Sequence, residues 1–216
     1  MKIAIHHTAG TFSERWIEYC INNDFSYKLV NCYSSDIIDQ LNDCQGLMWN
    51  WTLTDYKANL FARQLTISLE KKGLKVYPDI NTGWYYDDKL GQKYLFEAIK
   101  APFVKSFVFF SKEEAFAWIS KTTFPKVFKL RGGAGSSNVK LIQNKKSAKR
   151  IVKRAFGRGF PLYTKLLDLK QRIWVLKRDK DVNALISLSK GIVKFFLPKG
   201  EMALLPRQKG YAYFQE

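Results

Sequence analysis

The first hundred residues alternate short apolar runs with segments whose apolar positions recur at helical spacing. The apolar runs predict strands at Lys2–His6, Tyr27–Tyr33, Gly46–Trp51 and Leu74–Pro78. The periodic segments predict helices over Thr11–Asn22, from Ser34 or Ser35 through Leu41, and over Leu53–Lys72, which Gly73 terminates. This alternation indicates a parallel sheet covered by helices on both faces. No GxGxxG motif follows the first strand, which excludes a dinucleotide site of that type.

The pattern changes after a connecting loop predicted at Asn81–Tyr86. Asp87 and Asp88 open a helix predicted over Lys89–Lys100, and Pro102 ends that segment. We therefore expect a domain boundary near this proline, with one domain over residues 1–101 and a second over residues 102–216.

The second domain mixes strands and helices in a different order. A strand is predicted at Phe103–Phe110, and Ser111–Glu114 forms a capping box that opens a helix. Residues Phe124–Ile142 have the pattern of a strand, a glycine-rich loop and a second strand, followed by a helix over Ser147–Phe156. The chain is therefore of the α/β class, with a Rossmann-like parallel sheet first and an α+β domain with a glycine-rich hairpin second.

The segment Gly157–Lys209 is basic and apolar and is the hardest part of the chain to assign. Its apolar runs predict strands at Arg172–Leu176 and Gly191–Phe196. A last strand is predicted at Tyr211–Gln215.

Charge divides the chain in the same way as the secondary structure. The first hundred residues carry 11 Lys and Arg against 12 Asp and Glu, whereas the remaining residues carry 25 against 7, in a chain of net charge +17. An excess of this size in one half implies an anionic partner or an anionic surface nearby.

Cysteine and histidine usage excludes several classes of site. Cys20, Cys32 and Cys44 show no CxxC spacing, and His6 and His7 are the two histidines, so a structural zinc site and a Ser/His/Asp or Cys/His catalytic group are not expected. No apolar run reaches the roughly 20 residues of a membrane span, and the N-terminus lacks a signal-peptide core. We therefore expect a cytoplasmic protein.

The glycine-rich loop is the strongest candidate for chemistry. Glycines let the backbone approach an anion and aim N–H groups at it, and serine hydroxyls add donors. Lys129 lies on the strand that feeds the loop, and Arg131 adds positive charge. A plain hairpin whose glycines supply positive φ angles is the alternative. A Walker loop would need Gly-Lys-Ser/Thr followed by a helix, and the kinase loop has its lysine after the glycines, whereas here the lysine comes before them.

The order of several motifs resembles the ATP-grasp superfamily of carboxylate–amine and carboxylate–thiol ligases. The resemblance rests on Pro125-Lys126-Val127-Phe128-Lys129 before the glycine loop, Asp88-Lys89-Leu90 at a helix start, Ser111-Lys112-Glu113-Glu114-Ala115, and Tyr211-Ala212-Tyr213-Phe214-Gln215-Glu216. It spans nearly the whole chain and implies a pre-ATP-grasp domain followed by the first, nucleotide-binding lobe of an ATP-grasp domain.

The resemblance also implies roles for individual residues. Lys89 and Lys129 would bind the α- and β-phosphates of ATP, and the loop Gly132–Asn138 would close over the β- and γ-phosphates. Gln215 and Glu216 would meet the adenine edge. The expected nucleotide-binding residues are therefore Lys89, Lys129, Arg131, Gly132, Gly133, Gly135, Ser136, Ser137, Gln215 and Glu216.

By the same resemblance, the parent enzyme would use magnesium and activate a carboxylate substrate as an acyl-phosphate for attack by an amine or thiol. The family's magnesium ligands, a Glu and an Asn beyond the hinge, have no counterpart before Glu216, so no metal ligand and no catalytic residue is assigned. The segment Gly157–Lys209 is also longer than the family's usual connection to the hinge. We therefore expect a chain truncated at the hinge that is not catalytically competent alone.

A basic, non-enzymatic module is the alternative function. The segment Lys145–Phe156 predicts a basic amphipathic helix, and residues 145–209 could contact an anionic membrane or polymer surface, with nucleic acid a less favoured partner. Packing of the apolar face of that helix on the sheet is the interpretation we favour.

Overall fold

The computed structural model describes residues 1–52, 55–133, 138–161, 165–197 and 206–216, which form two compact units, Met1–Tyr86 and Asp87–Glu216. The first unit is a four-stranded parallel sheet in the order β2-β1-β3-β4. Its strands are β1 (Lys2–His6), β2 (Ser26–Val30), β3 (Gly46–Met48) and β4 (Lys75–Tyr77). Its helices are α1 (Phe12–Asn22), α2 (Ile37–Gln40), α3 (Tyr56–Lys71) and α4 (Ile80–Gly83).

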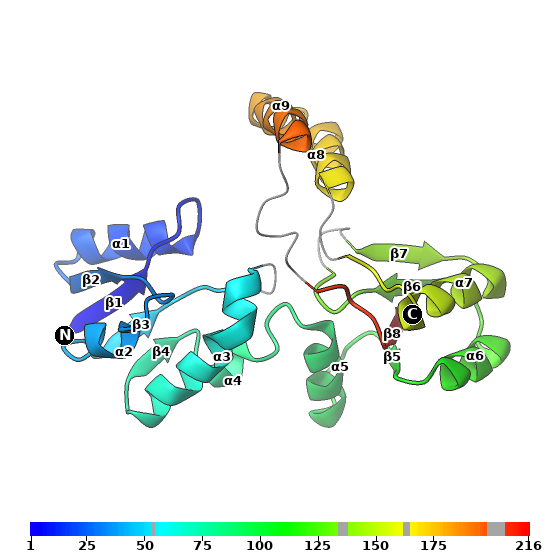
Figure 1. Cartoon of the computed structure of the whole chain (residues 1–216), viewed down its shortest axis with the longest axis horizontal. Coiled ribbons are helices and arrows are strands. Elements are labelled where there is room, and N and C mark those ends of the chain that lie inside the picture. Colours follow the sequence, from blue (N-terminus) through cyan, green and yellow to red (C-terminus); the bar gives the residue numbers. More distant parts are fainter. Residues whose placement is uncertain (53–54, 134–137, 162–164, 198–205) are drawn as a thin grey trace. The chain divides into compact units, whose positions relative to one another are not determined.

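The parallel sheet has helices on both faces, as the alternating pattern predicted. Figure 1 shows α1 on one side of the sheet and α2 and α3 on the other. The core on the second side joins strand residues such as Leu47 to Leu41 and Leu69, all nearly fully buried. The predicted loop at Asn81–Tyr86 is wrong in part, since Asp79 caps the short helix α4 by accepting a hydrogen bond from Thr82 N at 2.8 Å.

The second unit is a four-stranded antiparallel sheet in the order β5-β8-β6-β7. Its strands are β5 (Ser106–Phe109), β6 (Lys126–Lys129), β7 (Val139–Ile142) and β8 (Ala212–Gln215). Its helices are α5 (Lys89–Ala98), α6 (Lys112–Lys121), α7 (Lys145–Phe156), α8 (Lys165–Asp179) and α9 (Val182–Phe196). The strand nearest the end of the chain, β8, lies in the middle of the sheet.

One face of the antiparallel sheet is an aromatic core covered by α6 and α7. Phe107, Phe214 and Phe128 are cross-strand partners and therefore share this face. Ile119 of α6 and Val152 of α7 are fully buried against it. The favoured interpretation of the basic helix α7 is confirmed: its apolar face packs on the sheet, so that face is not available for insertion into a lipid surface.

The boundary between the two units falls before α5, between Tyr86 and Asp87. The sequence had predicted this boundary after the helix, near Pro102. The physical reason is a set of contacts at the start of α5. The carboxylate of Asp88 accepts hydrogen bonds from Arg131 Nε at 2.7 Å and Arg131 Nη2 at 2.5 Å, and Lys89 N donates to Arg131 O at 2.8 Å. These bonds tie α5 to the loop that follows β6.

The strands predicted at Arg172–Leu176 and Gly191–Phe196 are wrong, because both segments lie inside helices α8 and α9. Short β-branched and aromatic runs do not distinguish a strand from a helix. The helical form is supported by the pair Asp168–Arg172, four residues apart, and by Asp181, which caps α9.

We expect Phe214→Ala to destabilise the second unit by about 3–5 kcal/mol, because a fully buried ring at the centre of the aromatic core is lost. Phe110→Ala, where the side chain is 59% exposed, is the matched control and should change stability by less than about 1 kcal/mol. Urea unfolding followed by circular dichroism measures both. An effect of Phe214→Ala no larger than that of the control would contradict the placement of Phe214.

Candidate functional site

Lys129 and Gln215 lie on the face of the antiparallel sheet opposite the phenylalanine core. Lys129 is the last residue of β6, and Gln215 is the last residue of β8, so strand alternation places both away from Phe128 and Phe214. Lys129 Nζ donates to Gln215 Oε1 at 2.5 Å. This face therefore carries polar groups where the other carries the core.

The amide of Gln215 is held by two hydroxyl groups on the same face. Its Nε2 donates to Ser106 Oγ at 3.1 Å and to Tyr213 Oη at 3.2 Å, and Tyr213 Oη donates to Ser106 Oγ at 2.9 Å. Because Gln215 and Ser106 are buried, these bonds fix the orientation of the amide and aim its oxygen at Lys129. Sequence reasoning assigned Tyr213 to simple core packing and missed Ser106. The signal that could have revealed this polar face is the alternation of polar residues with phenylalanines in the strands, as at Tyr213 and Gln215 of β8.

Lys89 and Lys129, predicted to act together, influence each other electrostatically. The pKa of Lys129 is lowered from its ordinary value, first because the side chain is partly buried and second because the positive charge of Lys89 lies nearby. Lys89 begins α5 and donates from Nζ to Gln92 Oε1 at 3.1 Å. The structure thus brings two cationic side chains from separate segments into one neighbourhood.

Arg131 follows β6 in the chain, and its guanidinium donates hydrogen bonds to the carboxylate of Asp88 at the start of α5. The carboxylate of Asp88 is buried, and it also caps α5 by accepting from Leu90 N at 3.0 Å and Gly91 N at 3.1 Å. Sequence reasoning treated Asp88 only as a helix start and did not foresee its pairing with Arg131, 43 residues away. A positioning role for Arg131 accounts for this geometry.

Tyr211, the residue directly before β8, holds the same loop by a hydrogen bond. Its hydroxyl accepts a hydrogen bond from Arg131 N at 2.7 Å and donates to Gln208 Oε1 at 3.0 Å. Burial raises the pKa of Tyr211 to about 12, so the hydroxyl keeps its proton and can make both bonds at neutral pH. The backbone of the residue that precedes the glycines is therefore fixed.

The base of the glycine-rich loop is a tight turn. Gly133 N donates to Leu130 O at 2.8 Å, and Leu130 N donates to Asn138 O at 3.1 Å. A Cβ atom at Gly133 would lie 2.9 Å from Leu130 O and 3.0 Å from Asn138 O, so the close backbone approach requires glycine. Gly132 belongs to the same turn, whereas the predicted Gly135, Ser136 and Ser137 lie outside the described residues.

Glu216 lies at the end of β8, beside Lys126 rather than Lys129. Its carboxylate is 3.6 Å from Lys126 Nζ, and its backbone N–H donates to Lys105 O at 3.1 Å. That N–H is already bonded, so the predicted contact with adenine would use other groups of Glu216.

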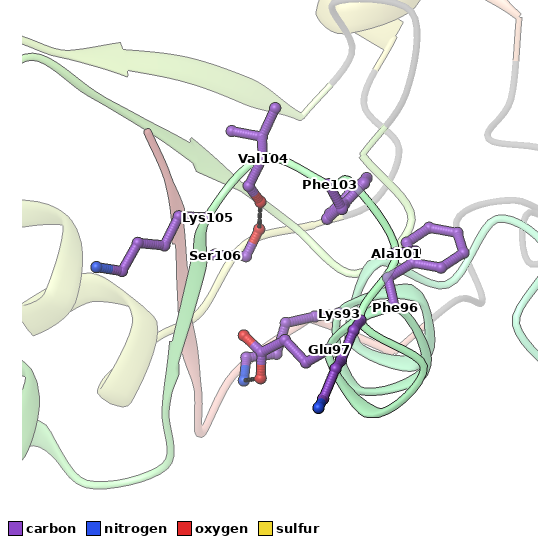
Figure 2. Close-up of a pocket in the computed structure, with 9 residues that line it drawn as sticks. Lys93, Phe96, Glu97, Ala101, Phe103, Val104, Lys105 and Ser106 are labelled. Atoms are coloured by element: carbon purple, nitrogen blue, oxygen red, sulfur yellow. Dashed lines mark hydrogen bonds and ion pairs between the residues drawn. The ribbon is translucent and has the colours of Figure 1, made fainter.

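A cavity of about 230 Å³ adjoins this network, between the second half of α5 and the start of β5. Figure 2 shows Lys93 and Glu97 of α5 facing the segment Phe103–Ser106, where Ser106 Oγ donates to Val104 O at 2.9 Å. The same Ser106 hydroxyl accepts from Gln215, so one residue of the cavity lining is linked to the Lys129–Gln215 pair. Sequence reasoning did not foresee it.

Candidate metal ligands do not cluster in the part of the chain that the structure describes. Within those ranges, no group of three or more His, Cys, Asp or Glu side chains is placed to hold a metal ion.

Comparison with known proteins places this geometry in a known fold. No family model matches the sequence, and no curated protein matches it. Among solved structures, the chain is similar to a RimK domain ATP-grasp protein from Sphaerobacter thermophilus, with a TM-score of 0.53 at 18% identity over 71% of this chain and 59% of that one. It is also similar to N5-carboxyaminoimidazole ribonucleotide synthetase from Thermus thermophilus, with a TM-score of 0.54 at 13% identity over 71% and 43%.

A third similar structure covers nearly all of this chain. It is the biotin carboxylase domain of the Hydrogenobacter thermophilus 2-oxoglutarate carboxylase, in complex with MgADP, ADP and bicarbonate, with a TM-score of 0.54 at 11% identity over 99% of this chain and 43% of that one. The chain therefore spans about half the length of these structures. With its parallel sheet followed by an antiparallel sheet and a glycine-rich hairpin, the chain has the ATP-grasp fold.

Proposed function

We propose that the second unit binds the phosphate tail of ATP at Lys89, Lys129 and the glycine-rich loop. The observation that carries the proposal is the electrostatic coupling of the two lysines. Lys129 is partly desolvated beside a second cation, and in the described part of the chain its acceptor is the neutral amide of Gln215. This arrangement disfavours the charged lysine in the free protein. A polyphosphate between the two ammonium groups would reverse that penalty.

The remaining groups on this face suit a nucleotide base. Val127 lies directly across from Gln215 in the sheet and offers an apolar surface, while Gln215 and Glu216 offer polar edges. Gly133 lets the backbone of the loop approach an anion closely. We assign ATP as the cofactor and Lys89, Lys129, Gly132 and Gly133 as the described groups that would hold its phosphates.

The reaction we propose for the parent enzyme is ATP-dependent ligation. Its carboxylate substrate would attack the γ-phosphate to give an acyl-phosphate and release ADP, and an amine or thiol would then attack the acyl carbon and displace phosphate. In such phosphoryl transfer the protein mainly positions the reactants and stabilises charge, so the lysines and the loop would act by neutralising the phosphate oxygens. The proposal for the substrate class rests on the fold shared with these ligases.

We expect Lys129→Ala to weaken ATP binding by roughly 10- to 100-fold, the cost of one charge-assisted hydrogen bond lost at a partly desolvated site. Lys140→Ala is the matched control, because Lys140 is an exposed lysine of the neighbouring strand β7 and shares the opposite face with Phe128. Calorimetric titration at moderate salt, with and without magnesium, measures both variants. Binding that survives Lys129→Ala and fades steeply with salt for any polyanion would favour the basic non-enzymatic module instead.

We expect Gly133→Ala to weaken ATP binding because the added Cβ forces the base of the loop to shift away from Leu130 O and Asn138 O. The control is Gly83→Ala, where the nearest atom to the added Cβ is 3.9 Å away. Titration with ATP and thermal unfolding should be run together on both variants. Unchanged affinity for ATP in a folded Gly133→Ala protein would count against the phosphate-binding role of the loop.

ATP affinity should fall as pH rises through the lowered pKa of Lys129 in the free protein. Bound phosphate raises that pKa again, so between the two values ATP binding takes up a proton, and well below both it takes up none. Calorimetry at alkaline pH in buffers of different ionisation enthalpy measures the proton uptake. Its absence, or its persistence in Lys129→Ala, would show that Lys129 is not the group that meets the phosphates.

A further inference from the structure

Helices α8 and α9 form a hairpin with one face that nothing in the described chain covers. Figure 1 shows the two helices side by side. They pack through the inner face of α9, where Arg172 Nη1 of α8 donates to Ser187 O at 2.9 Å and to Ser187 Oγ at 2.8 Å. Ala184 and Gly191 are buried on the same inner face, and a side chain at Gly191 would collide with that of Arg172.

The outer face of α9 is a continuous apolar surface exposed to solvent. At the helical rotation of about 100° per residue, six large apolar positions fall within an arc of about 120°. These positions, which we call the α9 outer face, are Val182, Leu185, Ile186, Ile192, Val193 and Phe196. They are 45–82% exposed, and Ser189 is the only other residue within the arc. An exposed apolar surface of this kind marks a site of interaction with a membrane or another molecule.

The hairpin that carries the apolar face is strongly basic. Residues 165–197 carry eight Lys and Arg against three Asp. Five of the basic side chains are exposed: Lys170, Lys177, Arg178, Lys180 and Lys190. Trp174 of α8 is 46% exposed among them. Among the basic side chains, Lys190 belongs to α9 and borders the α9 outer face, and an apolar helical face on a basic hairpin is suited to the boundary between anionic lipid headgroups and acyl chains.

We propose that the α8–α9 hairpin binds the surface of an anionic lipid bilayer, with the α9 outer face inserted among the acyl chains. Each helix has 15 residues, and no described helix is both long and apolar enough to cross a bilayer, which fits a helix lying in the interface. A second copy of the chain is disfavoured as the occupant, because two molecules of net charge +17 repel one another whereas an anionic surface attracts the hairpin.

The hairpin lies in a segment whose two ends are joined by a β-bridge between Phe160 and Gln208, so membrane binding need not disturb the sheet. Phe160 N donates to Gln208 O at 2.9 Å and Gln208 N donates to Phe160 O at 2.8 Å, which brings the two ends of the insertion together. Gly159 has φ +66° and a Cβ there would lie 2.6 Å from Gln208 O, so glycine is required at this closure. The segment that would contact the membrane thus begins after this closure and includes neither Lys89 nor Lys129.

The test is co-sedimentation of the full 216-residue chain with vesicles of phosphatidylcholine alone and of phosphatidylcholine mixed with phosphatidylserine. We expect binding to the mixed vesicles, weakened by salt. Phe196→Ser should reduce it roughly tenfold or more, and Lys177→Glu with Lys190→Glu should reduce it about fivefold or more for each lysine removed. Leu60→Ser, at a side chain 73% exposed, and Lys75→Glu, at an exposed lysine, are the matched controls in the first unit and should bind as the unaltered chain does.

Three outcomes would overturn the proposal. They are the absence of binding to the mixed vesicles, equal binding to vesicles without phosphatidylserine, and a molar mass in solution that shows a dimer which Phe196→Ser dissociates. Circular dichroism establishes that the variants keep their helix content, which is expected because the altered side chains are exposed. Lys180→Glu provides a second charge variant, in the turn between the two helices, should Lys177→Glu with Lys190→Glu fail to fold.

Discussion

The buried carboxylate of Asp88 is the constraint on which the arrangement of the second unit depends. It caps α5 and binds the guanidinium of Arg131, while Arg131 O accepts the N–H of Lys89. Lys89 follows Asp88 directly, and Lys129 precedes Arg131 by two residues. One ion pair therefore fixes the backbone close to both lysines, although the two lysines lie on elements that are far apart in sequence. Removing Arg131 would leave the buried carboxylate of Asp88 without its ion-pair partner, whereas the Arg131 side chain itself is 37% exposed.

The antiparallel sheet separates stability from chemistry by its two faces. Phe128, Phe214 and Ile142 turn toward α6 and α7 and supply the core, while Lys129, Gln215 and Tyr213 turn the other way. Because strand residues alternate, a single strand such as β6 serves both functions with no conflict between them. The cost of placing Lys129 among partly buried groups appears as its lowered pKa, and the aromatic core on the opposite face offsets that cost.

The sequence predicted the parallel sheet, the glycine hairpin and the cationic strand end because each depends on neighbouring residues. Periodicity identified β1, β6 and α7 without knowledge of the rest of the chain. Three features depended on distant contacts and were not predictable in this way. Strand β8 pairs with both β5 and β6 across a long insertion, α5 belongs to the second unit through Asp88 and Arg131, and Ser106 meets Gln215. The roles of the nucleotide-binding residues stay predictions.

Helices α7 and α9 show why amphipathic character alone does not identify a binding surface. Both have an apolar face beside basic residues, yet Ile151 and Val152 of α7 are buried while Val193 and Phe196 of α9 are exposed. The difference arises from the path of the chain around each helix. After α7 the chain turns back at Gly159 to join Gln208, which keeps α7 against the sheet, whereas α9 lies within the segment that this closure excludes. The entropic cost of closing a loop grows only slowly with its length. A helical hairpin can therefore lie between Phe160 and Gln208 while β8 still takes its place between β5 and β6.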